Sequence, residues 1–328
     1  MRAALLEKPG VIRIDEDPDF GNNTTNKVAL QYQLNDDIMI YGSWSEGFTE
    51  ATFQTLNLPV VGPLGCPQTV NVPTPFPLRR EIVTNREVGF RSDWRDGTLR
   101  FNATYFEAEW GGMRVNALPR DPCTLANLPQ PYLTSDGLGN ADGFEFEVMF
   151  APNDRWSLNA SLGLIDTAYR ATGVLTSTGL DLSGPIVTPL DPVNGTGIAP
   201  GSDSPFAYAP KKSASIGVQY ALPLESGATL TFVGNYGWRD KYVRDAANQR
   251  VPVDENGNYE FEPAYGLLNS RIVYAPAAGN WTASIWGTNL TDEQYVNGGF
   301  DARTVWGYDF SVIGPPRELG VGVSMSFR

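Results

Sequence analysis

The end of the chain carries the clearest pattern of apolar and polar positions. From Leu319 to Phe327 every odd-numbered residue is apolar, and every even-numbered residue between them is Gly or Ser. Successive side chains of a β-strand point to opposite faces. The spacing therefore predicts a strand with one apolar face and one small, polar face.

The same alternation recurs upstream, in pairs of segments joined by short polar turns. In residues 143–151, Phe144 and Phe146 share one face, and Glu145 and Glu147 share the other. The predicted strands are 28–34, 38–48, 81–93, 98–110, 143–151, 156–167, 212–220, the stretch through Leu230 and Trp238, 265–274, 281–290 and the last strand. This gives eleven strands, with a possible twelfth near Val11.

Which face of the predicted strand 38–48 points outward stays undecided. Both faces carry apolar residues, with Ile38, Ile40 and Trp44 on one and Met39 and Tyr41 on the other.

Turn and loop lengths alternate strictly along the chain. The short turns are 35–37, 94–97, 152–155, 224–227 and 276–280, and the long connections are 49–80, 113–140, 170–210, 240–262 and 291–316. A soluble sandwich gives no reason for this asymmetry, whereas an outer-membrane barrel has short periplasmic turns and long external loops. Aromatic residues near the short turns fit an interfacial girdle, namely Trp94, Trp156, Tyr220 and Trp281. We therefore predict an all-β, antiparallel transmembrane barrel.

Composition narrows the classes of function. Lys and Arg total 24 against 37 Asp and Glu, a net charge of −13, and there is no His. An acidic chain is a poor binder of nucleic acid, and the commonest metal ligand and general base is missing. No apolar run is long enough for a membrane-spanning helix. The apolar patch at Ala3–Leu6 is too short for a secretion signal, so we expect the true start to lie upstream.

No catalytic group of residues survives inspection, so we predict neither an enzyme nor a cofactor. The segment 254–259 begins like a calcium loop, but its sixth position is Tyr259 rather than Gly, and residues 137–142 lack the last glycine of a dinucleotide motif. Glu145 and Glu147 are better explained as wet lumen residues that pair with neighbouring Arg or Lys. Cys66 and Cys123 lie in long loops and are either a disulfide or two unrelated thiols.

Three features near the carboxyl end occur in a characteristic order. Asn289-Leu-Thr-Asp-Glu-Gln-Tyr295 closes one strand, Gly314-Pro-Pro-Arg317 follows a loop, and the alternating strand ends near Phe327. In this order they resemble the carboxyl end of a TonB-dependent outer-membrane receptor, a siderophore-receptor-like family. The resemblance reaches back to about Lys27. It implies that residues 27–328 form the carboxyl-terminal portion of the barrel, with about 11–12 of roughly 22 strands. It also implies that residues 1–26 are a loop or partial strand at a truncated start, and that the plug domain is absent.

The resemblance also implies a function and partners. The parent would take up a scarce nutrient, such as a ferric siderophore, across the outer membrane of a Gram-negative bacterium. Its partners would be outer-membrane lipid, the small nutrient ligand, the barrel-assembly machinery and, in the full-length parent, the TonB energy-coupling complex. The assembly signal would be Val321, Val323, Met325 and Phe327, although Arg328 takes the usual place of the final aromatic residue.

Two alternatives remain open at this point: a passive porin-like channel, and a secreted all-β protein that binds or acts on glycans.

Overall fold

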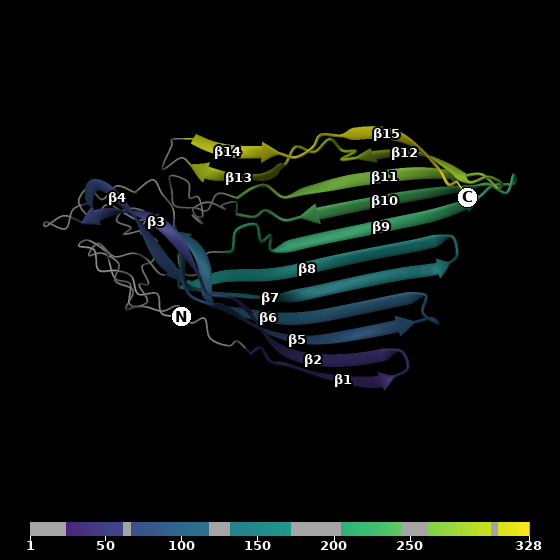
Figure 1. Cartoon of the computed structure of the whole chain (residues 1–328). Helices are drawn as coiled ribbons and strands as arrows, with labels where there is room; N and C mark the ends of the chain where they lie inside the picture. The colour runs from purple at the N-terminus through teal and green to yellow at the C-terminus, as the bar shows by residue number, and fades with distance from the viewer. Residues whose placement is uncertain are drawn as a thin grey trace.

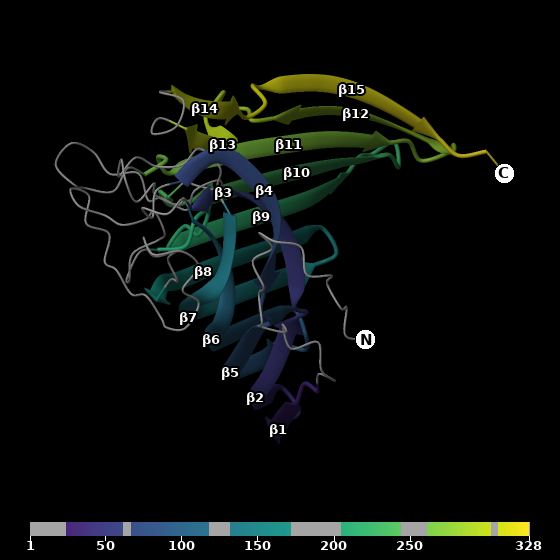
Figure 2. The same ribbon diagram turned by 60° about the vertical axis from the view of Figure 1, so that its left-hand side comes forward.

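The computed structural model describes residues 24–61, 67–117, 132–171, 205–243, 261–302 and 308–327. Its main element is an eleven-stranded antiparallel sheet. Figures 1 and 2 show that this sheet is strongly curved. Across the sheet the strands are β1 (Lys27–Asn35), β2 (Ile38–Thr49), β5 (Glu81–Trp94), β6 (Leu99–Ala117), β7 (Tyr132–Asn153), β8 (Trp156–Ala171), β9 (Lys212–Pro223), β10 (Thr229–Arg239), β11 (Tyr265–Ala275), β12 (Trp281–Thr288) and β15 (Glu318–Met325). This confirms the eleven predicted strands and their antiparallel order.

The short turns gather at one end of the sheet, beside the carboxyl terminus (Figure 1). Three of them use residues that suit a tight reversal. Asn35 accepts a hydrogen bond from the Asp37 amide at 2.9 Å, and Asn153 accepts one from the Arg155 amide at 2.9 Å. Gly97 has φ of +81°, a left-handed conformation that costs glycine nothing. These turns fix the register of the hairpins that they close.

The outer face of the sheet is apolar. Ile40, Phe90, Ala103, Phe146 and Leu162 are successive cross-strand neighbours, and cross-strand neighbours share a face. Because Ile40 belongs to this row, the open question about β2 is answered: its even-numbered residues face outward.

At the long-loop end, the outer face becomes charged along a single row. Arg86, Glu107, Asp142 and Asp166 are consecutive neighbours, and Arg86 lies 3.1 Å from Glu107. At the turn end the apolar band meets aromatic rings, such as the Trp156–Tyr220 pair with centroids 4.4 Å apart. A band bounded by charge on one side and aromatic residues on the other matches the hydrocarbon layer of a membrane.

The inner face carries the polar side chains. Tyr41, Gly89, Thr104, Glu145 and Gly163 form the row adjoining Ile40, on the opposite side of the sheet. The Tyr41 ring lies across Gly89, where an added Cβ would be 2.0 Å from the ring, and its hydroxyl is 3.2 Å from that of Thr104. Gly89 thus makes room for an inward-facing tyrosine.

Two further hairpins stand at the long-loop end, where the sequence predicted loops without strands. They are β3 (Thr52–Val61) with β4 (Pro67–Leu78), and β13 (Val296–Ala302) with β14 (Tyr308–Ile313). Figure 1 shows both hairpins at the end of the sheet away from the short turns. β6, β7 and β8 are also longer than predicted, so the wall rises above the apolar band.

Among the residues described, no helix is long and apolar enough to cross a membrane.

Candidate functional site

The inner wall of β5–β7 is charged and hydrogen-bonded. Asn85 donates to Glu87 at 2.7 Å, and the Arg91 guanidinium lies 5.2 Å from the centroid of the Tyr41 ring. Glu145 and Glu147 come from β7, opposite Thr104 and Asn102. Together these strands line an open cavity of about 390 Å³. The wall therefore offers carboxylates, amides and a cation to whatever fills the lumen.

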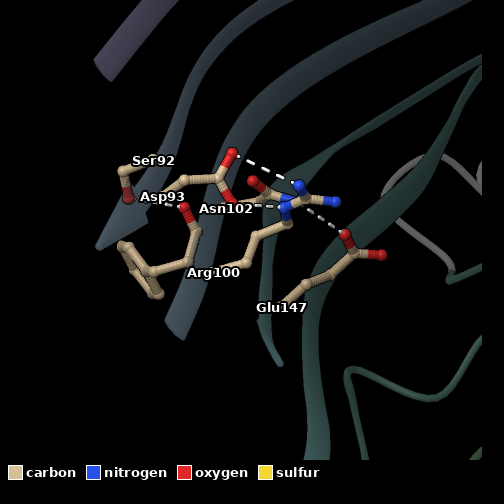
Figure 3. Close-up of polar contacts among 6 residues, drawn as sticks. Ser92, Asp93, Arg100, Asn102 and Glu147 are labelled. Atoms are coloured by element: carbon tan, nitrogen blue, oxygen red, sulfur yellow. Dashed lines mark hydrogen bonds and ion pairs between the residues drawn. The ribbon is translucent and has the colours of Figure 1, made fainter. Parts of the chain in front are cut away.

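Figure 3 shows the part of this wall nearest the short turns. The guanidinium of Arg100 donates to Asp93 at 2.7 Å, and Asn102 donates to Glu147 at 3.2 Å. Ser92, on the outer face, is buried and donates to the carbonyl of Phe101 at 2.8 Å. Glu147 thus has Asn102 as its partner, whereas the sequence had predicted an Arg or Lys.

From β8 onward the inner wall changes character and is mostly uncharged. The hydroxyls of Ser161 and Ser215 are 2.7 Å apart. Asn159 and Asn235 flank Gly217, where an added Cβ would be 2.4 Å from Asn159 Oδ1. Charge returns at β11, where Arg271 donates to Ser284 at 3.0 Å beside a second open cavity of about 440 Å³. The lumen thus has a charged sector and a neutral amide and hydroxyl sector.

Aromatic residues and an arginine meet at the long-loop rim of the inner wall. The Arg239 guanidinium lies 4.9 Å from the Tyr265 ring centroid and 5.7 Å from that of Tyr242. Tyr265 stacks on Tyr295 at 4.6 Å, and Tyr208 lies 5.8 Å from Tyr242. A cation beside aromatic faces is attracted to them. We call Arg239, Tyr208, Tyr242, Tyr265 and Tyr295 the rim cluster.

The rim cluster also holds the β13–β14 hairpin. The Tyr242 hydroxyl donates to the Val296 carbonyl at 3.0 Å, and the Tyr208 hydroxyl donates to the Gly299 carbonyl at 3.0 Å. Burial raises the pKa of Tyr242 above its ordinary value, and the neighbouring Tyr265 raises it further, against a lowering by Arg239. Its phenol therefore stays protonated and able to donate at physiological pH.

The structure places the predicted assembly signal on the outer face of the last strand and its end. Val321, Val323, Met325 and Phe327 are exposed by 82%, 77%, 52% and 84%. They stand in one row on a strand whose second edge has no partner strand among those described. Their role in assembly stays a prediction. Cys66, Cys123 and the segment 254–259 lie outside the described residues.

Other candidate chemistry from the sequence has a plainer explanation. The glycine-rich stretch 137–142 lies within β7, so it is strand rather than a nucleotide-binding turn. Among the residues described, no group of three or more His, Cys, Asp or Glu side chains is placed to hold a metal ion. Glu145 and Glu147 face the lumen as predicted, on the inner wall.

Sequence reasoning missed the rim cluster. Its members come from four separate segments, spread over 88 positions of the chain, from Tyr208 to Tyr295. The signal in the sequence is weak: the four tyrosines lie at, or within five residues of, the outer ends of predicted strands, and they have no shared spacing.

A curled antiparallel sheet with an apolar outer face, a polar inner face and short turns at one rim defines the wall of a bacterial outer-membrane β-barrel. Within that class the sequence identifies the family. Residues 11–290 match the family model for the TonB dependent receptor-like β-barrel, and the chain belongs to this family.

Solved structures show the same fold. The ferric yersiniabactin uptake receptor FyuA from Yersinia pestis is 16% identical, with a TM-score of 0.63, over 92% of this chain and 37% of that one. The siderophore receptor PiuA from Acinetobacter baumannii is 18% identical, with a TM-score of 0.57, over 91% and 35%. The ferripyoverdine receptor of Pseudomonas aeruginosa is 16% identical, with a TM-score of 0.55, over 90% and 32%.

The chain thus spans a little over a third of the length of FyuA and PiuA and about a third of that of the ferripyoverdine receptor. Among curated protein sequences, none matches it.

Proposed function

We propose that this chain is the carboxyl-terminal wall of an outer-membrane receptor that takes up a scarce nutrient, such as a ferric siderophore, with energy supplied through TonB. The observation that carries the proposal is the two-sided wall: an apolar outer face and a polar inner face, with cationic and aromatic side chains at one rim. The names of the structural neighbours support a ferric chelate as the ligand, since FyuA is a ferric yersiniabactin uptake receptor, PiuA is a siderophore receptor and the third is a ferripyoverdine receptor.

The rim cluster is our candidate for first contact with the ligand. Arg239 is exposed, and Lys241, two residues further on, has its ammonium 4.6 Å from the Phe261 ring centroid. The rim thus presents two cations, Arg239 and Lys241, beside the carboxylates of Asp240 and Glu262. Cations with aromatic faces suit an anionic, aromatic chelate.

In this proposal the parts of the chain have distinct partners. The apolar band contacts outer-membrane lipid, and residues 27–328 enclose one side of the lumen. A plug and a TonB-contacting segment would come from the rest of the parent protein. Outward-facing Val321, Val323, Met325 and Phe327 would meet the barrel-assembly machinery. None of these contacts requires catalysis, so we propose a transporter and no enzyme.

The test uses the gene in its full coding context, in a Gram-negative host that lacks its own siderophore receptors. Iron-limited growth on a panel of ferric siderophores should depend on the receptor and on TonB. Arg239→Ala should weaken ligand binding about tenfold or more, since a desolvated cation–π contact and an ion pair each contribute about 1–2 kcal/mol. The matched control is Arg155→Ala, an exposed arginine at the short-turn rim.

The outcomes separate the alternatives. Uptake that persists without TonB would indicate a passive porin-like channel. A product that stays soluble and monodisperse without detergent would indicate a secreted glycan-binding protein. Equal affinity of Arg239→Ala and Arg155→Ala for the ligand would refute the role of the rim cluster while leaving the receptor function standing.

A further inference from the structure

The last two strands of the sheet have no tight turn between them on the chain. β12 ends at Thr288 and β15 begins at Glu318, so the whole connection 289–317 intervenes. Nevertheless the two strands pair without a bulge, from Thr288 opposite Glu318 to Trp281 opposite Met325. In ordinary hairpins the length and type of the turn set this register. Here something else must set it.

The side chains of β15 do not set the register unaided. On the inner face Trp286 lies over Gly320, where an added Cβ would be 2.3 Å from its ring. A slip of two residues would bring Gly322 under the same ring. On the outer face Leu319, Val321 and Val323 repeat with the same period, so the slipped strand would keep an apolar outer face. Gly-rich strands of this kind specify register weakly.

At the short-turn end of the β12–β15 pair, the contacts would also be possible after a slip of two residues. The Asn280 side chain donates to the carbonyl of Ser326, and the Ser326 amide donates to the Asn280 carbonyl at 2.8 Å. These bonds use the main chain of β15's extension, which offers the same groups at every second residue.

A compact group of bonds at the long-loop rim is specific instead. Asn289 is 4% exposed and has φ of +46°, a conformation that asparagine tolerates better than most residues. Its Nδ2 donates to the Glu293 carbonyl at 2.9 Å and to the Pro315 carbonyl at 3.1 Å, and its Oδ1 accepts from the Glu293 amide at 2.9 Å. The Asn289 amide donates to Asn269 Oδ1 on β11 at 2.9 Å.

The second half of the group ties down the start of the last strand. Asp292 Oδ1 accepts from the Arg317 amide at 3.0 Å, one residue before β15. The Gly314 amide donates to the Tyr295 carbonyl at 2.8 Å, and the Tyr295 ring covers Gly314 so closely that an added Cβ would be 2.1 Å away. We call Asn289, Asp292, Tyr295, Gly314 and Arg317 the clasp.

We propose that the clasp sets the register of the last strand, acting in place of the missing tight turn. It holds the two ends of a 29-residue connection at fixed positions. A strand slipped by two residues would bring Val312 or Pro316 against the Tyr295 ring in place of Gly314, where an added Cβ would be 2.1 Å from the ring. Pro315 and Pro316 also have no amide to replace those of Arg317 and Gly314. This gives a physical role to the Asn-Leu-Thr-Asp-Glu segment and the Pro-Pro-Arg segment, whose residues bind each other across the base of the loop.

The register matters because the second edge of β15 pairs with no strand in the described part of the chain. A slip of two residues would move that edge by about 7 Å along the strand, since each residue rises about 3.4 Å. The strand that completes the barrel must pair with this edge, and Phe327 would leave its level in the membrane. The clasp therefore fixes the position of the β15 edge with which the closing strand must pair. This role does not depend on which ligand the receptor takes up.

Disulfide crosslinks in the full-length receptor can report the register directly. Cys66 and Cys123 are first replaced by Ser. Ser284 faces Gly322 in this structure, so the pair S284C and G322C reports the native register. The pair S284C and S324C reports a slip of two residues, and the pair T282C and G322C reports the same slip in the other direction. Each pair is combined with Asn289→Ala plus Asp292→Ala, or with the control Thr291→Ala, an exposed residue between them.

With the control, only the native pair should crosslink. In the clasp variant we expect a slipped pair to rise at least about tenfold, because each hydrogen bond lost shifts an equilibrium roughly two- to tenfold. An unchanged native crosslink in a clasp variant that still assembles would overturn the proposal. If the clasp variant does not assemble, the oxidised S284C and G322C pair should restore assembly, since it imposes the register covalently. Failure of that rescue would overturn the proposal equally.

Discussion

Ile216 provides the sharpest test of which face meets lipid. It lies on β9 four residues from Lys212 and four from Tyr220, so it stands midway across the apolar band. Its outer-face neighbours are Ala160 and Tyr236, and it is 47% exposed. Ile216→Arg would place a guanidinium near the middle of the bilayer. Such a charge on the lipid face of a barrel costs about 2–4 kcal/mol, or roughly 30- to 1,000-fold in the folding equilibrium.

The matched control is Ser215→Arg, one residue away at the same depth. Ser215 faces the lumen and bonds to Ser161 at 2.7 Å, so the substitution should cost only about 1 kcal/mol for that bond. The free energy of unfolding is measured by urea titration of the complete receptor in phospholipid vesicles, followed by tryptophan fluorescence. Equal losses for the two variants, or a larger loss for Ser215→Arg, would refute the assignment of faces.

Two further predictions concern the inner wall and the rim. Gly89→Leu should lower the free energy of unfolding by about 1–3 kcal/mol, because the Tyr41 ring occupies the space of the new side chain. The control in the same urea titration is Gly42→Ala, whose added Cβ would lie 3.7 Å from the nearest atom, the Glu87 carbonyl oxygen. The folded pKa of Tyr242 lies above its unfolded value of 10.0, so the stability from its protonated phenol is complete below pH 10.0 and is lost as pH rises through the folded pKa. Proteolysis of the β13–β14 hairpin should therefore accelerate in alkali in the wild type, and Tyr242→Phe should remove that pH-dependent part.

The strands of the membrane band could be predicted because one physical constraint acts on every one of them. Each must present apolar side chains to hydrocarbon at every second position and satisfy its backbone through its neighbours. The repeat in 143–151 is a direct consequence, and the structure places Phe144 and Phe146 on one face and Glu145 and Glu147 on the other. The short turns follow from the same constraint, since the chain reverses directly at the membrane boundary.

The sequence did not predict the hairpins above the membrane, because the requirement for an apolar residue at every second position ends at the rim of the barrel. β4 contains Pro73, Pro75 and Pro77, which lack the amide hydrogen that a strand interior uses and so indicate a loop. The β3–β4 hairpin tolerates them because, among the strands that the structure describes, β4 pairs with β3 alone. β14 carried a usable signal, since Tyr308, Phe310 and Val312 alternate in the way that the membrane strands do.

The rim cluster could not be predicted for a different reason. Tyr208 and Tyr242 are far from β13 in sequence. The length of a connection does not predict where the chain returns to the wall, so their approach to β13 cannot be read from the sequence. Their partners are the main-chain carbonyls of Val296 and Gly299, which any residue provides. Contacts of this kind leave no trace in residue type, so only the folded chain shows them.

The distribution of buried residues shows which solvent stabilises the wall. Ala108, Ala141 and Thr167 are buried neighbours on the inner face, near the long-loop rim, where the Phe206 amide donates to Thr167 at 3.0 Å. The outer wall is the reverse: Val321 is 82% exposed, with no second layer over it in the described part of the chain. A secreted all-β module would bury its apolar wall against such a layer. An apolar outer wall of this kind suits hydrocarbon rather than water, and in the proposed receptor its apolar band gains its transfer energy from the bilayer rather than from a protein core.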